Sequence, residues 1–302
     1  MLEVLVNGRR NVLCAFLLVL PLSAVADYNH SSSRSELGAA TALELTRRYN
    51  DMRENCGAEW LASYRCVGVL LRGTSTATTY NTWEPNPDTV KAGRGMTFSY
   101  LNRTASLPMT IGSKGYVAYP EQLAPDYKFR LNFLCAFPVS GATTHRDAKG
   151  CGQHALHKAS RPCSQEQVFT AGQYRQKYLL DPASGALQQR QCGFSLLHTS
   201  SNHAAYAFRQ MLELTREIPP SGTNDQNELL ADNPAVGVTS AQWPIEAFYY
   251  NKADGLEGAR IDQRNYFNKS GIMLPIIKLT LPVSGQSDAA FEYLESDQVT
   301  FQ

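Results

Sequence analysis

The sequence lacks several features that would place a protein in a common functional class. Its 302 residues carry a formal net charge of +1 with no block of like charges, so it has no electrostatic footprint for nucleic acid. No segment of the expected mature chain approaches the length of a membrane helix, and no internal repeat is present. A Gly-x-Ser-x-Gly elbow is also missing, which leaves a serine hydrolase with little support. The hydrophobic fraction of 43% supports a packed globular core.

The N-terminal stretch has the pattern of a secretory signal peptide. Arg9 and Arg10 form a basic region, residues 12–22 form a short apolar run, and Ala24-Val25-Ala26 resembles a cleavage site. The run is too short to anchor the chain in a bilayer. We therefore expect residues 1–26 to be removed and residues 27–302 to form one domain, exported to the periplasm or the extracellular space.

The expected mature chain retains six cysteines, and an even count in an exported chain predicts disulfides. The six residues are Cys56, Cys66, Cys135, Cys151, Cys163 and Cys192. Proximity in the sequence favours Cys56–Cys66 and Cys151–Cys163, which leaves Cys135–Cys192. The residue types of Cys151, His154, His157 and Cys163 also suit zinc, but an oxidising compartment favours the disulfide interpretation.

The apolar segments and turn residues predict a mixed α+β organisation. Strands are expected at residues 68–72, 96–101, 115–119, 129–138, 194–197, 241–250 and 272–283, and helices at 35–53 and 202–217. Residues 221–239 are polar and predict a loop, and residues 251–263 predict a loop with one helical turn. Residues 140–190 predict a loop-rich segment, so we expect a disulfide-pinned insertion over about 100–193.

Arg72 directly follows the predicted strand Gly68-Val69-Leu70-Leu71 and precedes Gly73, Thr74 and Ser75. An arginine at this position must keep its guanidinium in a cleft, on an anion or in water, because burying it unpaired is costly. The planar guanidinium also suits a diphosphate. Arg72 is therefore a candidate phosphate anchor; the plainer alternative is an arginine that leaves the strand and pairs with a nearby carboxylate.

Three segments in order resemble the ADP-ribosyltransferase toxins, in their Arg / Ser-Thr-Ser / Glu branch. The first is Leu70-Leu71-Arg72-Gly73-Thr74-Ser75, with Pro87 to Met96 behind it. The second is His198-Thr199-Ser200-Ser201 before a helix, with the register of the hydroxyl triplet left open. The third is Trp243-Pro244-Ile245-Glu246-Ala247-Phe248. Most of the chain from Asp27 onward also resembles halovibrin-type secreted proteins.

The resemblance implies an ADP-ribosyltransferase-like split β-sheet core and a site for NAD as substrate, with no metal and no separate cofactor. Glu246, Arg72 and Ser200 would be the catalytic residues. Glu246 would stabilise the positive charge on the ribose as nicotinamide leaves. Gly73, Thr74 and Thr199 would help bind NAD, and Tyr249, Tyr250 or Trp83 would stack on nicotinamide.

Two features depart from the family pattern. Arg72 and Thr199 are 127 positions apart (199 − 72), which the expected insertion explains. Transferring members carry Glu or Gln two positions before the catalytic Glu, and here that position is Pro244. Transfer to a protein acceptor then becomes less favoured than transfer to water. The resemblance therefore points to an NAD glycohydrolase, with a host protein acceptor and an immunity protein left open as partners.

Each candidate also has a plainer interpretation. Glu246 could be a surface residue of a strand, Thr199 and Ser200 could cap the following helix, and the aromatic residues at 248–250 could belong to the core. The alternative for the whole chain is a disulfide-stabilised secreted binding module, of the kind associated with adhesins, without catalysis. The order of the three segments favours the enzyme.

Overall fold

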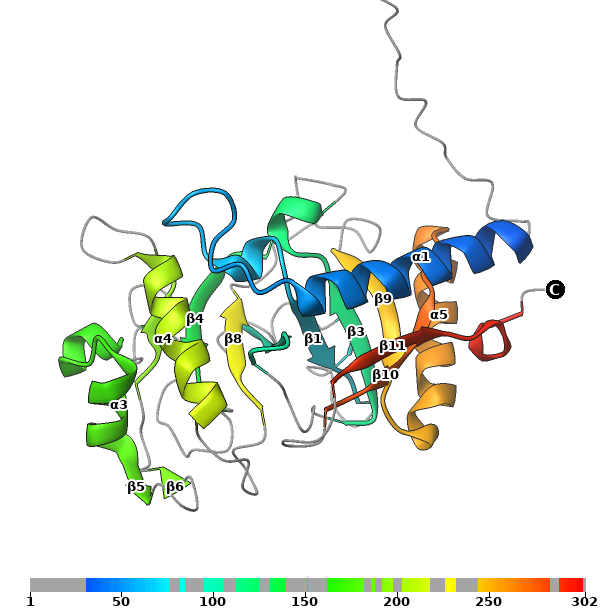
Figure 1. Cartoon of the computed structure of the whole chain (residues 1–302). Helices are drawn as coiled ribbons and strands as arrows, with labels where there is room; N and C mark the ends of the chain where they lie inside the picture. The colour runs from blue at the N-terminus through cyan, green and yellow to red at the C-terminus, as the bar shows by residue number, and fades with distance from the viewer. Residues whose placement is uncertain are drawn as a thin grey trace, which may run out of the picture.

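The computed structural model describes residues 31–75, 82–84, 95–105, 112–124, 131–139, 151, 162–181, 186–187, 192–197, 203–217, 226–231, 244–282 and 288–300. These residues form a mixed α+β fold around a nine-stranded sheet (Figure 1). The strand order is β11-β10-β9-β3-β1-β2-β8-β4-β7, with a separate two-stranded sheet of β5 and β6. The predicted α+β class is confirmed.

The strands are β1 (Val69–Gly73), β2 (Met96–Leu101), β3 (Lys114–Ala118), β4 (Phe133–Phe137), β5 (Leu179–Asp181), β6 (Ala186–Leu187), β7 (Phe194–Ser195), β8 (Glu228–Ala231), β9 (Ile245–Tyr250), β10 (Ile276–Thr280) and β11 (Ala290–Tyr293). Among the described residues, the neighbouring strands of the nine-stranded sheet are antiparallel, except for β9 with β10, which are parallel. The expected strand at 96–101 matches β2.

The sheet changes partners in the middle of β2. Residues 99–101 of β2 pair with β1, ending at Leu71 opposite Ser99. Residues 96–98 pair with β8 on the other side, ending at Phe98 opposite Leu229. Neither neighbour pairs with β2 along its whole length, and the pairing of β1 with β2 ends just before Arg72. This handover positions the candidate site.

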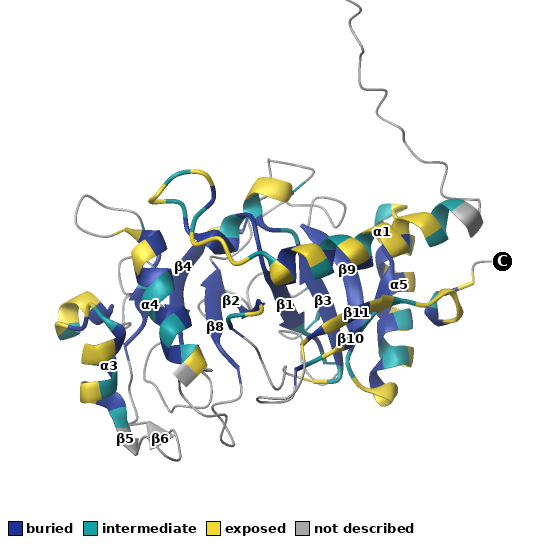
Figure 2. Cartoon of the chain, in the orientation of Figure 1, coloured by how far each residue is buried: buried dark blue, intermediate teal, exposed yellow. Residues whose placement is uncertain are grey.

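Four α-helices lie among the described residues: α1 (Ser31–Asn50), α3 (Ala171–Tyr178), α4 (Ala204–Glu217) and α5 (Leu256–Ser270). The short 3-10 helices are Ser63–Arg65, Glu121–Leu123, Cys163–Glu166, Ala253–Gly255 and Glu295–Asp297. Helix α1 packs along β10 and β11, α5 packs on β3 and β9, and α4 packs on β4 and β7. The strands are largely buried and the helices expose one side (Figure 2). None of the described helices could span a membrane.

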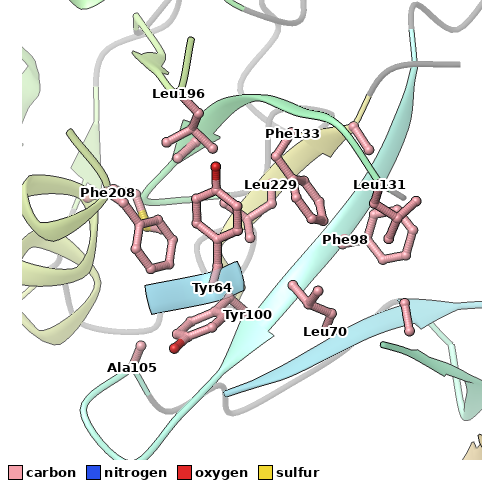
Figure 3. Close-up of a cluster of buried hydrophobic side chains, with 14 of the residues drawn as sticks. Tyr64, Leu70, Phe98, Tyr100, Ala105, Leu131, Phe133, Leu196, Phe208 and Leu229 are labelled. Carbon is pink, nitrogen blue, oxygen red and sulfur yellow. The ribbon is translucent and has the colours of Figure 1, made fainter. Parts of the chain in front are cut away.

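The core is divided between two main clusters. Leu45 and Tyr49 of α1 pack with Leu71, Val117 and Tyr249 in one cluster. The larger cluster joins the sheet to α4 and α5 and includes the residues labelled in Figure 3. Its aromatic rings meet edge to face, as Tyr64 does with both Phe133 and Phe208, which is a preferred geometry for such pairs.

The three disulfides correct part of the predicted pairing. Cys56–Cys66 is confirmed. The other two bonds are Cys135–Cys151 and Cys163–Cys192, instead of Cys151–Cys163 and Cys135–Cys192. Proximity in the sequence was a poor guide because a bridge between Pro162 and Gly193 sets Cys163 beside Cys192, which leaves Cys151 to pair with Cys135 of β4. Since Cys151 and Cys163 are both in disulfides, the zinc interpretation is also wrong.

Three further expectations need correction. Residues 100–193 are not an excursion from the sheet, because they contribute β3 and β4 to its interior. Residues 221–239, expected to be a loop, contain β8. Residues 251–263, expected to be a loop with one helical turn, contain the first half of α5. The α5 helix ends at Gly271, whose φ of 71° lies in the left-handed region that favours glycine. The outer surface of α5 is polar, which weakens the apolar periodicity from which a helix would be predicted.

Candidate functional site

Arg72 occupies the point where β1 leaves β2. Its side chain is buried, with 2% exposed. Nη1 donates a hydrogen bond of 2.8 Å to the backbone oxygen of Thr97, and the guanidinium carbon lies 5.9 Å from the centre of the Phe98 ring. The Arg72 side chain therefore binds a backbone carbonyl of β2 just beyond the last β1–β2 pair. Arg72 lies near the end of β1, as the sequence predicts.

A small pocket forms beside Arg72, between β1, β2 and the start of β8. It is lined by Leu71, Arg72, Gly73, Thr97, Phe98, Ser99, Gln226, Asn227 and Glu228. Its volume of about 10 Å³ is room for about one water molecule. A buried guanidinium, a hydroxyl, an amide and a carboxylate thus border one space. Burying this many polar groups is costly unless they serve each other or a ligand.

Asn227 holds the start of β8 against β2. Its Oδ1 accepts from the backbone N–H of Tyr100 at 2.7 Å, and its Nδ2 donates to the Tyr100 carbonyl at 2.8 Å. The side chain thus replaces the pair of backbone hydrogen bonds that the β8 ladder no longer supplies at this position. Gln226 and Glu228, on either side of Asn227, are fixed in place as a result.

Glu246, the carboxylate expected to be catalytic, lies elsewhere. Its side chain is 5% exposed and accepts a hydrogen bond from Nη2 of Arg48, which is itself fully buried in α1. Burial raises the pKa of Glu246, while the Arg48 guanidinium acts in the opposite direction. Strand β3 separates β9 from β1, and Glu246 does not line the Arg72 pocket.

The expected NAD-binding residues are dispersed. Gly73 lines the Arg72 pocket. Tyr249 is fully buried under α1, and its ring packs so closely on β3 that a Cβ at Gly115 would lie 2.8 Å from it. It is therefore not placed to stack on a ligand. Thr199 and Ser200 lie outside the described residues.

Thr74 belongs to a buried polar cluster on α5. Its Oγ1 donates to Oδ2 of Asp262 at 3.1 Å and accepts from Nζ of Lys114 at 3.1 Å. Lys114 also forms an ion pair with Asp262. Burial raises the pKa of Asp262, opposed by the charge of Lys114. Through this cluster Thr74, which lies two positions after Arg72, is attached to α5.

Glu228, Gln226, Ser99 and Asp262 were missed by the sequence interpretation. The polar run at 221–239 concealed a four-residue strand, and Asp262 falls in a helix that was expected to be a loop. One signal was present: Gln226 stands two positions before Glu228, the spacing sought without success before Glu246. The order of arginine before glutamate is kept.

The chain matches no protein-family model, and no curated protein matches it. Within the described ranges, no group of three or more His, Cys, Asp or Glu residues is arranged to hold a metal ion.

Proposed function

We propose that this chain is an exported enzyme that cleaves the nicotinamide–ribose bond of NAD, with Glu228 as the catalytic carboxylate and Arg72 as the anchor for the diphosphate. The single observation that carries this proposal is the pocket at the β2 handover, where Arg72 and Glu228 are both buried and border the same space. Arg72 keeps the role that the resemblance implies, and Glu228 replaces Glu246.

The sequence around Glu228 supports this choice. Gln226 stands where the transferring ADP-ribosyltransferases carry Glu or Gln, two positions before the catalytic Glu. Pro244 no longer argues against transfer, because it precedes a glutamate that is paired with α1. The handover in β2 is also compatible with the split-sheet core that the resemblance implies. The three disulfides are typical of an exported chain.

The residue types suit the reaction. As the C1′–N bond breaks, the bonding electrons leave with nicotinamide, which departs neutral, and positive charge builds on the ribose. The Glu228 carboxylate would stabilise that charge as it develops. Ser99 would contact the ribose hydroxyls, and Gln226 would orient the attacking water or acceptor. The pocket must widen on binding, because its present volume admits one small group only.

Nicotinamide release from NAD by the oxidised chain tests the proposal, with Glu228→Gln and Glu246→Gln compared side by side. We expect release by the unmodified chain and a loss of about 100-fold in Glu228→Gln, typical for removal of a transition-state stabiliser. Glu246→Gln keeps an acceptor for Arg48 and should retain activity. Loss in Glu246→Gln alone, or no NAD cleavage by the unmodified chain, would overturn the assignment.

The fate of the ADP-ribosyl group is a separate measurement. Equal yields of nicotinamide and free ADP-ribose would mean transfer to water, whereas a deficit of ADP-ribose would mean transfer to an acceptor. Gln226→Ala should lower transfer to an acceptor more than it lowers nicotinamide release, because Gln226 is placed to orient the acceptor and not the leaving group.

A further inference from the structure

A second and much larger cavity lies between the segment that follows α1, the turn after β2, and α4. Its volume is about 290 Å³, close to the lower end of ordinary ligand sites. One wall carries Arg53 and Glu54, and the opposite wall is the side of α4 that presents Tyr206, Arg209 and Arg216. None of these residues borders the Arg72 pocket.

The lining of this cavity has a small formal excess of positive charge, and its glutamate on α4, Glu213, pairs with Arg175 at 3.5 Å. Three arginines and two glutamates line it. Arg53 pairs with Asp51 at 2.6 Å, and Arg209 pairs with Glu54 at 2.7 Å. Arg216 instead donates from Nε to the backbone oxygen of Thr104 at 2.6 Å. Among the described residues no carboxylate lies within ion-pair distance of Arg216, and its side chain is exposed to solvent.

The geometry of α4 places these groups in line. Arg209 and Arg216 are seven positions apart, or about two helical turns, and therefore share one face of α4. The backbone oxygen of Thr104 holds the Arg216 guanidinium through Nε, which fixes its orientation at the cavity rim. A planar guanidinium held in this way is suited to phosphate, which it can bind with two parallel hydrogen bonds.

An aromatic ring stands beside the arginines. Tyr206 is 43% exposed, and the guanidinium of Arg209 lies 5.9 Å from the centre of its ring. Exposed tyrosine rings bind planar heterocycles by stacking. Gln210 on the same helix accepts a hydrogen bond at Oε1 from the backbone N–H of Ala171, 2.8 Å away. The cavity thus combines a flat apolar surface with directed cationic donors.

We propose that this cavity binds a phosphate-bearing nucleotide of about the size of a mononucleotide, with its phosphate on Arg216 and Arg209 and its base on Tyr206. The site is distinct from the pocket of the proposed NAD cleavage and does not depend on that activity. AMP is a suitable probe because it has no nicotinamide–ribose bond and cannot be a substrate for the proposed reaction.

Isothermal titration calorimetry of the full oxidised chain with AMP, adenosine and inorganic phosphate tests this site. We expect AMP to bind more tightly than either fragment. Arg209→Gln/Arg216→Gln should weaken AMP at least about tenfold, since two charged hydrogen-bonding groups are lost. Arg216→Lys should recover only part of the affinity, because it keeps the charge without the planar fork. Tyr206→Ala should weaken AMP but not phosphate.

Arg103→Gln is the matched control, because Arg103 is an exposed arginine outside the cavity, paired with Asp288. It should bind AMP as the unmodified chain does. Absence of AMP binding, equal binding by the double variant, or adenosine or phosphate binding as tightly as AMP would overturn the proposal.

Discussion

Two buried arginine–glutamate neighbourhoods in this molecule contain the same residue types and differ in the space beside them. Arg48 and Glu246 pair directly between α1 and β9, and both are almost completely enclosed. Arg72 and Glu228 are equally buried, yet they come from strands on opposite sides of β2 that pair with different halves of it, and they border a pocket. Helix α1 covers the first neighbourhood, whereas the second lies at a break in the sheet.

The contrast indicates which buried charges are available for chemistry. A carboxylate bound to a buried arginine under a helix has its charge already balanced and no space for a ligand. A guanidinium and a carboxylate that border one pocket at a gap between strands can share a ligand between them. Burial and residue type therefore do not separate a structural pair from a candidate site, but the neighbouring space does.

The largest effect should come from truncating the enclosed pair. Glu246→Ala leaves the fully buried Arg48 guanidinium with only the partly exposed Glu44, 3.7 Å from its Nε, and we expect a loss of about 3–5 kcal/mol in the free energy of unfolding. Urea denaturation measures it. Arg48→Met/Glu246→Leu, which removes both charges, should recover most of the loss or all of it. If the double variant is as unstable as Glu246→Ala, the cost comes from packing and not from the stranded charge.

Substitution of Asn227 should have a smaller effect on stability, and it tests whether Asn227 positions Glu228. Asn227→Ala removes both hydrogen bonds to Tyr100, and Asn227→Asp keeps only the one accepted from the Tyr100 N–H. We expect a loss of about 1–3 kcal/mol in stability for Ala, and a loss at least as large for Asp, because its buried carboxylate would face the Tyr100 carbonyl oxygen. If Glu228 is catalytic, the kcat for nicotinamide release should fall in the same order while KM changes little. A change in KM alone would mean that Asn227 acts on binding and not on the position of Glu228.

Much of the sheet could be predicted from sequence, and the site only in part. Strands such as β2 and β3 have an apolar residue pattern that can be recognised without knowing which strands they pair with. By contrast, β8 is four residues long and is stabilised by pairing with β2 and β4, so nothing local distinguishes it from a loop. Arg72 could be found because a charge after an apolar strand is unusual. Choosing between Glu246 and Glu228 required knowing that α1 supplies Arg48, a contact 198 positions away in the sequence.

The smallest expected effect concerns Asp262, the carboxylate that ties Thr74 and Lys114 to α5 beyond Arg72. Burial raises its pKa in the folded chain, so between the ordinary value of about 3.9 and the raised value the folded chain binds more protons than the unfolded chain. In that window the free energy of unfolding must fall as pH rises. Asp262→Asn cannot titrate and lacks this contribution.

The measurement is urea unfolding of both proteins at a series of pH values from about 4 upward. The difference in unfolding free energy, unmodified chain minus Asp262→Asn, should decrease with pH by at most about 1.4 kcal/mol per pH unit and then level off. A difference that instead increases with pH would mean that Lys114 outweighs burial and holds the carboxylate ionised. The Thr74 cluster would then be a net electrostatic support for the end of β1, and the raised pKa of Asp262 would be wrong.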